Sequence, residues 1–372
     1  MLTRAKDEAN ARILHSSLNG YANCPMTGAS TDERFEALRT WLAAHLPAPL
    51  REIAPASNDA SFRRYFRISL AQTVAVPDRD AQVATLIVVD APPPQEDCRP
   101  YIAVARLLRD SGVHAPAVLA SDLERGFLLV TDLGTRTYLD ALDEASAPKL
   151  YGEACAALLR LQCASREGVL PPYDETLLRR ELNLFPDWYV ARHLGASLSG
   201  AQRATLESTF RVVLDNNLAQ PRVFVHRDYH SRNLMVSEPN PGVLDFQDAV
   251  YGPITYDLVS LLRDAYVEWD EEQQIDWAVR YWERARDAAL PVRADFADFW
   301  RDFEWMGVQR QLKVLGIFAR LSHRDGKHAY LDDMPRVMRY LRGACARYRE
   351  LAPLLSLLDG IEKRQPVVGY TS

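Results

Sequence analysis

Residues 223–248 read VFVHRDYHSRNLMVSEPNPGVLDFQD, and they are the strongest indication of the fold in this chain. The stretch has the pattern of a short strand, a polar loop and a hairpin of two more short strands. His226, Asp228 and Asn233 fit the spacing H-x-D-x-x-x-x-N, and Asp245-Phe246 follows the hairpin. Salt-bridged loop acids are the structural alternative. A second acid at hairpin distance, flanked by apolar strands, makes a chance match a poor explanation.

This spacing is typical of phosphoryl transfer. In such sites an aspartate accepts the proton of the acceptor hydroxyl, while an asparagine and a second aspartate hold magnesium ions. The short loop lets the Asp228 carboxylate face the acceptor while the Asn233 amide turns back toward the metal. Asp245 then arrives from the opposite side. We expect His226 to brace the loop and not to react.

Composition narrows the class of protein. The chain has 372 residues, of which 48% are hydrophobic and 25% are charged, as in an ordinary globular protein of about two domains. A net charge of −6 argues against a nucleic-acid surface. No apolar run reaches the length of a membrane span, and the five cysteines show neither disulfide nor zinc spacing. We therefore predict a cytoplasmic protein with no nucleic-acid or membrane partner. We also expect a monomer, although composition does not determine the oligomeric state.

The periodicity along the chain predicts an N-terminal extension and two lobes. Residues 1–30 have weak periodicity, and we expect a disordered extension. Residues 31–132 combine helices at 31–46 and 101–111 with several strand patterns, which predicts a small antiparallel sheet lobe. Residues 133–372 are mainly helical, and among the predicted helices are those over 174–193 and 255–269. The predicted fold class is therefore α+β, with a nucleotide-binding sheet lobe and a larger helical lobe for catalysis and substrate.

A sheet lobe, a hinge near residues 129–134 and a helical lobe carrying H-x-D-x-x-x-x-N and then D-F resemble the aminoglycoside-phosphotransferase branch of the protein-kinase-like fold. The loop differs from that of an ordinary protein kinase. Tyr229-His230 follows the first aspartate, Gln247 follows Asp245-Phe246, and no A-P-E motif is present. Asp257, in PITYDLVSLL, is similar to the helix acid with which this branch braces its catalytic loop.

Five segments in order resemble, more narrowly, the cell-wall-recycling kinases that phosphorylate the C1 hydroxyl of N-acetylmuramate and N-acetylglucosamine with ATP. They read SNDASFRRYFRI, VVDAPPPQEDCRPY, LLVTDLGTRTYL, HRDYHSRNLMV and EWMGVQRQLKVLGIFARL. The resemblance implies ATP and Mg²⁺ as cofactors and an amino sugar as the small-molecule substrate. It also implies that Asp228 is the base and that Asn233 and Asp245 are the metal ligands.

The nucleotide site departs from the usual pattern. The resemblance implies that adenine faces backbone groups of Thr131, Asp132 and Leu133, and that a loop with Ser57, Asn58 and Ser61 replaces the glycine-rich loop. The expected strand lysine is missing, because no lysine lies between Lys6 and Lys149. Either an arginine supplies the cation, or the chain is an inactive relative. The intact Asp228, Asn233 and Asp245 favour an arginine, and the candidates are Arg63, Arg64 and Arg67.

Substrate chemistry separates the remaining hypotheses. A polycationic aminoglycoside needs an acidic pocket, whereas the lactyl carboxylate of N-acetylmuramate needs a cation and an aromatic platform. The candidates for contacting the sugar are Glu181, Trp188, Asp248, Trp305, Arg310 and Lys313. Core packing is the alternative for the aromatic residues, and a solvated helix face is the alternative for the two cations. An antibiotic phosphotransferase, a small-alcohol kinase and a pseudokinase that only binds remain as rival functions.

Overall fold

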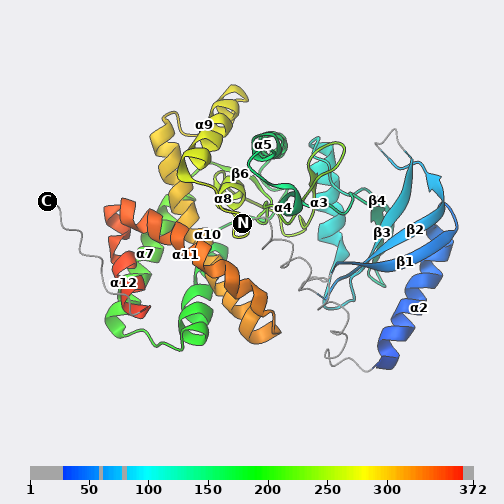
Figure 1. Cartoon of the computed structure of the whole chain (residues 1–372), viewed down its shortest axis with the longest axis horizontal. Helices are drawn as coiled ribbons and strands as arrows, with labels where there is room; N and C mark the ends of the chain where they lie inside the picture. Colours follow the sequence, from blue (N-terminus) through cyan, green and yellow to red (C-terminus); the bar gives the residue numbers. More distant parts are fainter. Residues whose placement is uncertain (1–27, 58–61, 78–81, 363–372) are drawn as a thin grey trace, which may run out of the picture.

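An antiparallel sheet of five strands forms the smaller lobe of the protein, for which a computed structural model describes residues 28–57, 62–77 and 82–362 (Figure 1). The strands lie in the order β1-β2-β3-β5-β4. Their bounds are β1 (Leu50–Ser57), β2 (Arg64–Val74), β3 (Val83–Asp90), β4 (Val118–Asp122) and β5 (Phe127–Thr131). The predicted antiparallel sheet is therefore confirmed.

Each face of the sheet packs against a helix. On the outer face, α2 (Gly28–His45) buries Leu38 and Trp41 against a cluster that includes Ile68 and Phe127. On the inner face, α3 (Cys98–Asp110) joins the core that continues into the helical lobe. Because side chains alternate along a strand, β2 turns one set of residues toward α2 and the other toward the helical lobe.

The helical lobe follows directly after β5. Its first half contains α4 (Tyr138–Ala141), α5 (Ala147–Cys163), α6 (Glu175–Leu182), the π-helix η1 (Phe185–His193) and α7 (Gly200–Leu218). Its second half contains α8 (Tyr256–Leu262), α9 (Glu271–Asp287), α10 (Phe296–Asp325), η2 (His328–Asp333), α11 (Met334–Arg347), η3 (Arg349–Leu351) and α12 (Ala352–Ile361). The 30-residue α10 crosses the lobe and is buried on most sides.

Four short strands lie between α7 and α8, and residues 223–248, with the H-x-D-x-x-x-x-N spacing, lie among them. Strand β6 (Arg222–Val225) pairs with β9 (Val250–Pro253), and β7 (Leu234–Met235) pairs with β8 (Gly242–Val243). A Cβ atom at Gly242 would lie 2.9 Å from Cδ1 of Leu133 and from Oγ of Ser237, so these side chains would have to shift. The hairpin therefore packs closely against the chain that links the two lobes.

Two expectations about helices need correction. A single helix was expected over residues 174–193, but α6 ends at Leu182 and a wider π-helical segment starts at Phe185, with Pro186 in its first turn. The helix expected over residues 255–269 ends at Leu262. The predicted extension over residues 1–30 lies almost entirely outside the described residues, as do Asn58 and Ser61. Within the described ranges, no helix is both long and apolar enough to cross a membrane.

Candidate active site

The turn after β6 carries Asp228 and is fixed by Asp257. The buried Asp257 carboxylate accepts the backbone N–H of His226 at 2.6 Å and that of Arg227 at 3.0 Å. Arg227 has a φ of 78°, a conformation that non-glycine residues adopt only where their surroundings hold it. The two hydrogen bonds to Asp257 supply this constraint. They determine the direction in which the next residue, Asp228, leaves the strand.

His226 ties this turn to the strand-like segment before Asp245. Its Nε2 lies 3.0 Å from the carbonyl oxygen of Leu244, and its Nδ1 lies 3.2 Å from the backbone N–H of Asp228. These partners assign the proton to Nε2, since Nδ1 must accept. Burial lowers the pKa of His226 to about 4, so the ring is neutral near pH 7. Its geometry is that of a brace.

Asn233 and Asp245 lie side by side next to this turn. The Asn233 side-chain amide donates to the backbone oxygen of Asp228 at 3.0 Å and lies 3.4 Å from Asp245 Oδ2. Oxygen donors of this kind suit Mg²⁺, which takes one or two protein ligands together with substrate phosphates. The described residues contain no group of three His, Cys, Asp or Glu side chains that could hold a metal alone. A metal shared with nucleotide phosphates fits this donor set.

The charges around Asp228 favour its ionised form. Burial alone would raise the pKa of Asp228, but Lys313, His230 and Arg227 outweigh it and lower that pKa below its usual value. Among the described residues, the Asp228 carboxylate accepts no hydrogen bond that would occupy it, as a general base requires.

Glu181 forms ion pairs with the two cations beside Asp228. Its buried carboxylate lies 2.5 Å from the Arg227 guanidinium and 3.2 Å from the Lys313 ammonium. Lys313 also donates to the Tyr256 hydroxyl at 2.9 Å. The structure therefore brings Glu181 and Lys313 to the site, as a buried ion-pair cluster behind the catalytic loop. The charges of Glu181 and Lys313 face each other, and that of Lys313 also acts on Asp228.

Two predicted sugar contacts, Trp305 and Arg310, are buried on α10. The Trp305 side chain is almost fully buried and packs against Tyr348, with ring centroids 5.8 Å apart. The buried Arg310 donates to the Ser260 hydroxyl at 2.8 Å, and its charge acts on His230 and Asp257. The prediction for Trp305 is corrected, because α10 is enclosed on most sides and helical spacing does not reveal an exposed face. A contact between Arg310 and the sugar stays a prediction. Trp188 packs partly buried against the core and Asp248 is exposed, so their roles stay predictions.

The three candidate arginines of the sheet lobe have different partners. Arg63 forms an ion pair with Glu96 at 2.8 Å, just before α3. Although its burial acts in the opposite direction, Tyr65, Glu96 and Asp245 together raise the pKa of Arg63. The Arg63 guanidinium therefore lies within the electrostatic field of the predicted metal ligand. Arg63 and Glu96 together resemble the lysine–glutamate pair of the phosphoryl-transfer template.

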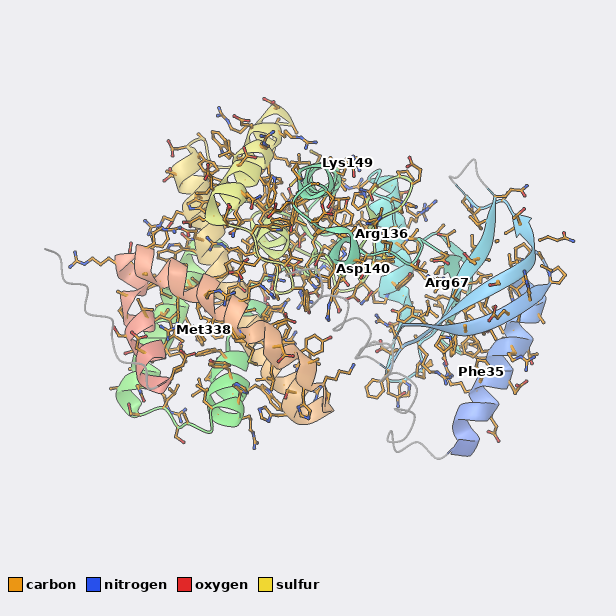
Figure 2. All side chains as sticks on the ribbon, in the orientation of Figure 1. Phe35, Arg67, Arg136, Asp140, Lys149 and Met338 are labelled. Carbon is orange, nitrogen blue, oxygen red and sulfur yellow. The ribbon has the colours of Figure 1, made fainter. Side chains whose placement is uncertain are left out.

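The other two arginines serve the architecture of the sheet lobe. Arg64 donates to the fully buried Asp90, which also accepts from Arg34 of α2. The prediction that Arg64 binds nucleotide is therefore corrected, because it lies on the face covered by α2. Arg67, labelled on the sheet lobe in Figure 2, donates to Asp132 at 2.7 Å and to the backbone oxygen of Gly134. These bonds join β2 to the link between the lobes.

The side chains of residues 131–133, in the link between the lobes, make contacts within the protein. The Thr131 hydroxyl accepts the backbone N–H of Ala117 at 2.9 Å, and the Asp132 carboxylate accepts from Arg67 and from the backbone N–H of Gly134. Leu133 is buried. The predicted contacts of residues 131–133 with adenine involve backbone groups and stay predictions, as does the role of Ser57 at the end of β1.

Two residues near the site were not predicted from the sequence. Tyr101 of α3 packs against Phe246 with ring centroids 4.8 Å apart, and thereby connects the sheet lobe to the Asp245 segment. Glu96 is the partner of Arg63. Both lie in the segment VVDAPPPQEDCRPY, but nothing in its spacing indicated which acid or ring faces the site.

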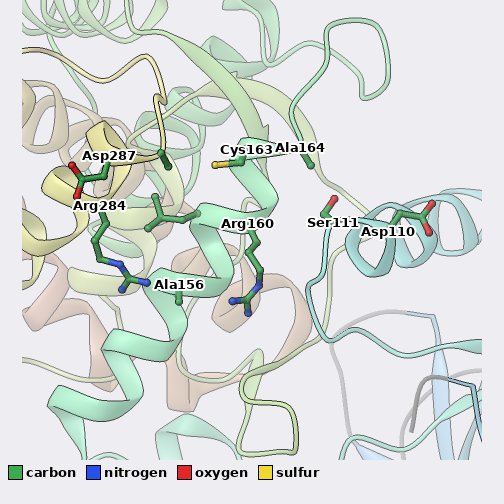
Figure 3. Close-up of a pocket in the computed structure, with 10 residues that line it drawn as sticks. Asp110, Ser111, Ala156, Arg160, Cys163, Ala164, Arg284 and Asp287 are labelled. Carbon is green, nitrogen blue, oxygen red and sulfur yellow. The ribbon is translucent and has the colours of Figure 1, made fainter.

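A large surface depression lies elsewhere. It has a volume of about 810 Å³ and lies between the ends of α3 and α9 and the side of α5 (Figure 3). Its lining includes Asp110, Arg160, Cys163, Arg284 and Asp287, and none of the candidate residues. The candidate site is therefore defined by its chemistry and not by the volume of this cavity.

Comparison with known proteins identifies the class that this fold and site define. A family model described as the phosphotransferase enzyme family matches residues 52–296. The chain belongs to this phosphotransferase family.

Among its relatives is a Pseudomonas aeruginosa protein named N-acetylmuramate/N-acetylglucosamine kinase, 53% identical over 342 residues that cover 89% of this chain and 98% of the relative. A Neisseria meningitidis serogroup B protein of the same name is 49% identical over 325 residues, 86% of this chain and 94% of the relative.

Solved structures of more distant proteins share the fold. The amicoumacin kinase hAmiN, in complex with AMP-PNP, Ca²⁺ and Ami, has a TM-score of 0.57 at 12% identity, and the match covers 86% of this chain and 96% of that chain. An aminoglycoside phosphotransferase in a ternary complex with streptomycin and ATP has a TM-score of 0.54 at 14% identity, with 86% and 97% covered. These comparisons confirm the predicted two-lobed, protein-kinase-like fold of the aminoglycoside phosphotransferase type.

Proposed function

We propose that this protein is an ATP-dependent kinase that phosphorylates the C1 hydroxyl of N-acetylmuramate and N-acetylglucosamine during peptidoglycan recycling. The names of relatives at 48–53% identity over most of the chain support this substrate class. The observation that carries the proposal is the position of Asp228. Its carboxylate is ionised and available for a proton, beside the adjacent oxygen donors Asn233 and Asp245.

The proposed reaction is a direct transfer. The C1 hydroxyl oxygen attacks the γ-phosphorus of ATP, the bond to the β-phosphate oxygen breaks, and the hydroxyl proton passes to Asp228. Asn233 and Asp245 would hold Mg²⁺, which when bound neutralises charge on the phosphates. Arg63, placed by Glu96, would bind the phosphates in place of a lysine. Asp257 and His226 keep the loop in position, so catalysis rests mainly on positioning and electrostatics.

The rival functions receive less support. Among the described residues beside Asp228, the cations Arg227 and Lys313 form ion pairs with Glu181. This cluster is not the acidic pocket that a polycationic antibiotic needs. The missing lysine was the main argument for a pseudokinase, and the Arg63–Glu96 pair offers a replacement. Structures of choline-kinase type share only the fold, at 11% and 15% identity. The location in the cytoplasm and the monomeric state stay predictions.

A substrate panel tests the proposal. ATP consumption is measured with N-acetylmuramate, N-acetylglucosamine, kanamycin and choline under the same conditions. We expect turnover with the two amino sugars and none with the other acceptors. Turnover of kanamycin alone would establish the antibiotic phosphotransferase, and binding of Mg-ATP without any turnover would establish the pseudokinase.

A further inference from the structure

Arg232 is an exposed cation in the catalytic loop, immediately before Asn233. Its guanidinium carbon lies 4.0 Å from the centroid of the Tyr266 ring and 5.5 Å from that of Tyr330. Its Nη1 is 3.5 Å from the Tyr330 hydroxyl. Among the described residues no carboxylate forms an ion pair with it, in contrast to Arg227 of the same loop, which is paired with Glu181.

Arg232 lies against an aromatic cluster of Tyr266, Phe318 and Tyr330, which we call its aromatic seat. Tyr266 follows α8, Phe318 belongs to α10 and Tyr330 belongs to η2, and Phe318 contacts both tyrosines, with ring centroids 6.0 and 5.1 Å apart. The buried Asp264 connects this seat to the catalytic loop. Its carboxylate accepts the backbone N–H of Ser231 and that of Tyr266, each at 2.8 Å. The aromatic seat is therefore fixed relative to the loop that carries Asp228.

The stacking determines which part of the guanidinium is available. A guanidinium that stacks on an aromatic ring uses its flat face, while its N–H groups point outward in the plane. Two of these N–H groups match the two oxygens of a carboxylate. Arg232 is thus an exposed and oriented donor for a planar anion, at the edge of the catalytic loop.

We propose that Arg232 binds the lactyl carboxylate of N-acetylmuramate and determines the preference for this acidic sugar over neutral N-acetylglucosamine. The inference rests on the proposed function. Arg232 lies four positions after Asp228, so a fully extended chain would separate their Cα atoms by at most about 14 Å. The loop is more compact, because His230 N–H donates to Asp228 O at 3.1 Å and Asn233 N–H donates to His230 O at 2.9 Å. The two Cα atoms are therefore closer than this limit, a separation that the arginine side chain and one sugar with its lactyl group are long enough to span.

The other cations near the loop are less suited to this role. Lys313 and Arg227 both bind Glu181, and Arg310 is buried against Ser260. Recruiting one of them would break an existing buried interaction, and a buried charge that loses its partner is costly. Arg232 can bind a carboxylate while its stacking contacts stay in place.

The test compares both sugars in Arg232→Gln, Arg232→Lys and the wild type. We expect Arg232→Gln to lower kcat/KM for N-acetylmuramate by about tenfold to a hundredfold, mainly through KM, because a charge-assisted contact is lost. N-acetylglucosamine should change less than about twofold. Arg232→Lys should recover part of the loss, since it keeps the charge without the fork. Arg222→Gln is the matched control, because Arg222 is also exposed and lies over a tyrosine ring, 5.6 Å from the Tyr251 centroid.

A chemically modified substrate gives an independent test of the role of Arg232. The methyl ester of N-acetylmuramate has no carboxylate charge, so wild type and Arg232→Gln should use it equally well. An equal loss on both sugars, or no loss on N-acetylmuramate, would overturn the assignment of Arg232. If the wild type phosphorylates neither sugar, the proposed function fails instead, so the two failures are distinguishable.

Discussion

At the scale of single residues, the site depends on the ionisation of Asp228 and on the groups that aim it. Asp228→Asn keeps the size of the side chain but removes its ability to take a proton. We expect kcat to fall by about two to four orders of magnitude while ATP binding persists. ADP release and calorimetric titration of ATP measure the two effects separately. Asp276→Asn, which changes an exposed acid of α9, should leave both unchanged; full activity in Asp228→Asn would contradict the role of Asp228 as base.

His226 predicts a pH dependence of stability. Burial lowers its pKa from 6.5 to about 4 in the folded protein, so the folded state binds fewer protons than the unfolded state between these values. His226 therefore contributes stability that is fully present above about pH 6.5 and is lost as the pH falls toward 4. His226→Gln should flatten the melting temperature across this window relative to wild type. An identical pH dependence in both proteins would contradict the assignment of a neutral, buried ring.

The comparison must be made as a difference because Asp257 acts in the opposite direction. Burial raises the pKa of Asp257 to about 7, so its contribution to stability is fully present below about pH 3.8 and is lost as the pH rises toward 7. Both proteins retain Asp257, so subtracting their melting curves leaves the contribution of His226.

At the scale of elements, side chains alternate between the two faces of the sheet, so neighbouring arginines at the start of β2 have different partners. Arg63, before the strand, meets Glu96, whereas the next residue, Arg64, meets Asp90 on the α2 side. We expect Arg63→Ala to lower kcat/KM for ATP by about tenfold to a hundredfold through loss of a phosphate contact. Arg63→Lys should restore most of it. Initial rates at varied ATP measure this effect. Arg64→Lys is the control, and an equal loss in it would contradict the difference between the two faces.

The same elements show what the sequence could predict. The spacing of His226, Asp228, Asn233 and Asp245 is local, so the chain alone predicted that they would lie together. The sequence could not choose among three neighbouring arginines, because the answer depends on where α2 and α3 dock on the sheet. It also misplaced Trp305, because a central helix is enclosed on several faces and has no single apolar stripe.

Long-range pairs were also hidden from the sequence. Glu181 and Lys313 were both expected to contact the sugar, yet they meet each other across 132 positions of the chain. Arg232 was not singled out, because its aromatic seat is assembled from residues more than thirty positions away. Electrostatic partners of this kind become visible only when the helices of the lobe are in place.

At the scale of the whole molecule, the two lobes contribute different halves of the proposed nucleotide site. Arg63 comes from the sheet lobe, whereas Asn233 and Asp245 come from the helical lobe. Bound Mg-ATP should therefore stabilise the folded protein by mass action and raise its melting temperature. We expect Asp245→Ala to lose the magnesium-dependent part of this increase, as measured by thermal shift with and without EDTA. An undiminished magnesium effect in Asp245→Ala would remove Asp245 as a metal ligand.

The most direct measurement of the central claim is the identity of the phosphorylated product. Wild-type protein is incubated with ATP, Mg²⁺ and either amino sugar, and the position of the new phosphate is determined by ³¹P and ¹H NMR. The account predicts a sugar 1-phosphate from both N-acetylmuramate and N-acetylglucosamine, with Asp228→Asn giving almost none. A phosphate on any other hydroxyl, or phosphorylation of kanamycin in place of the sugars, would contradict it.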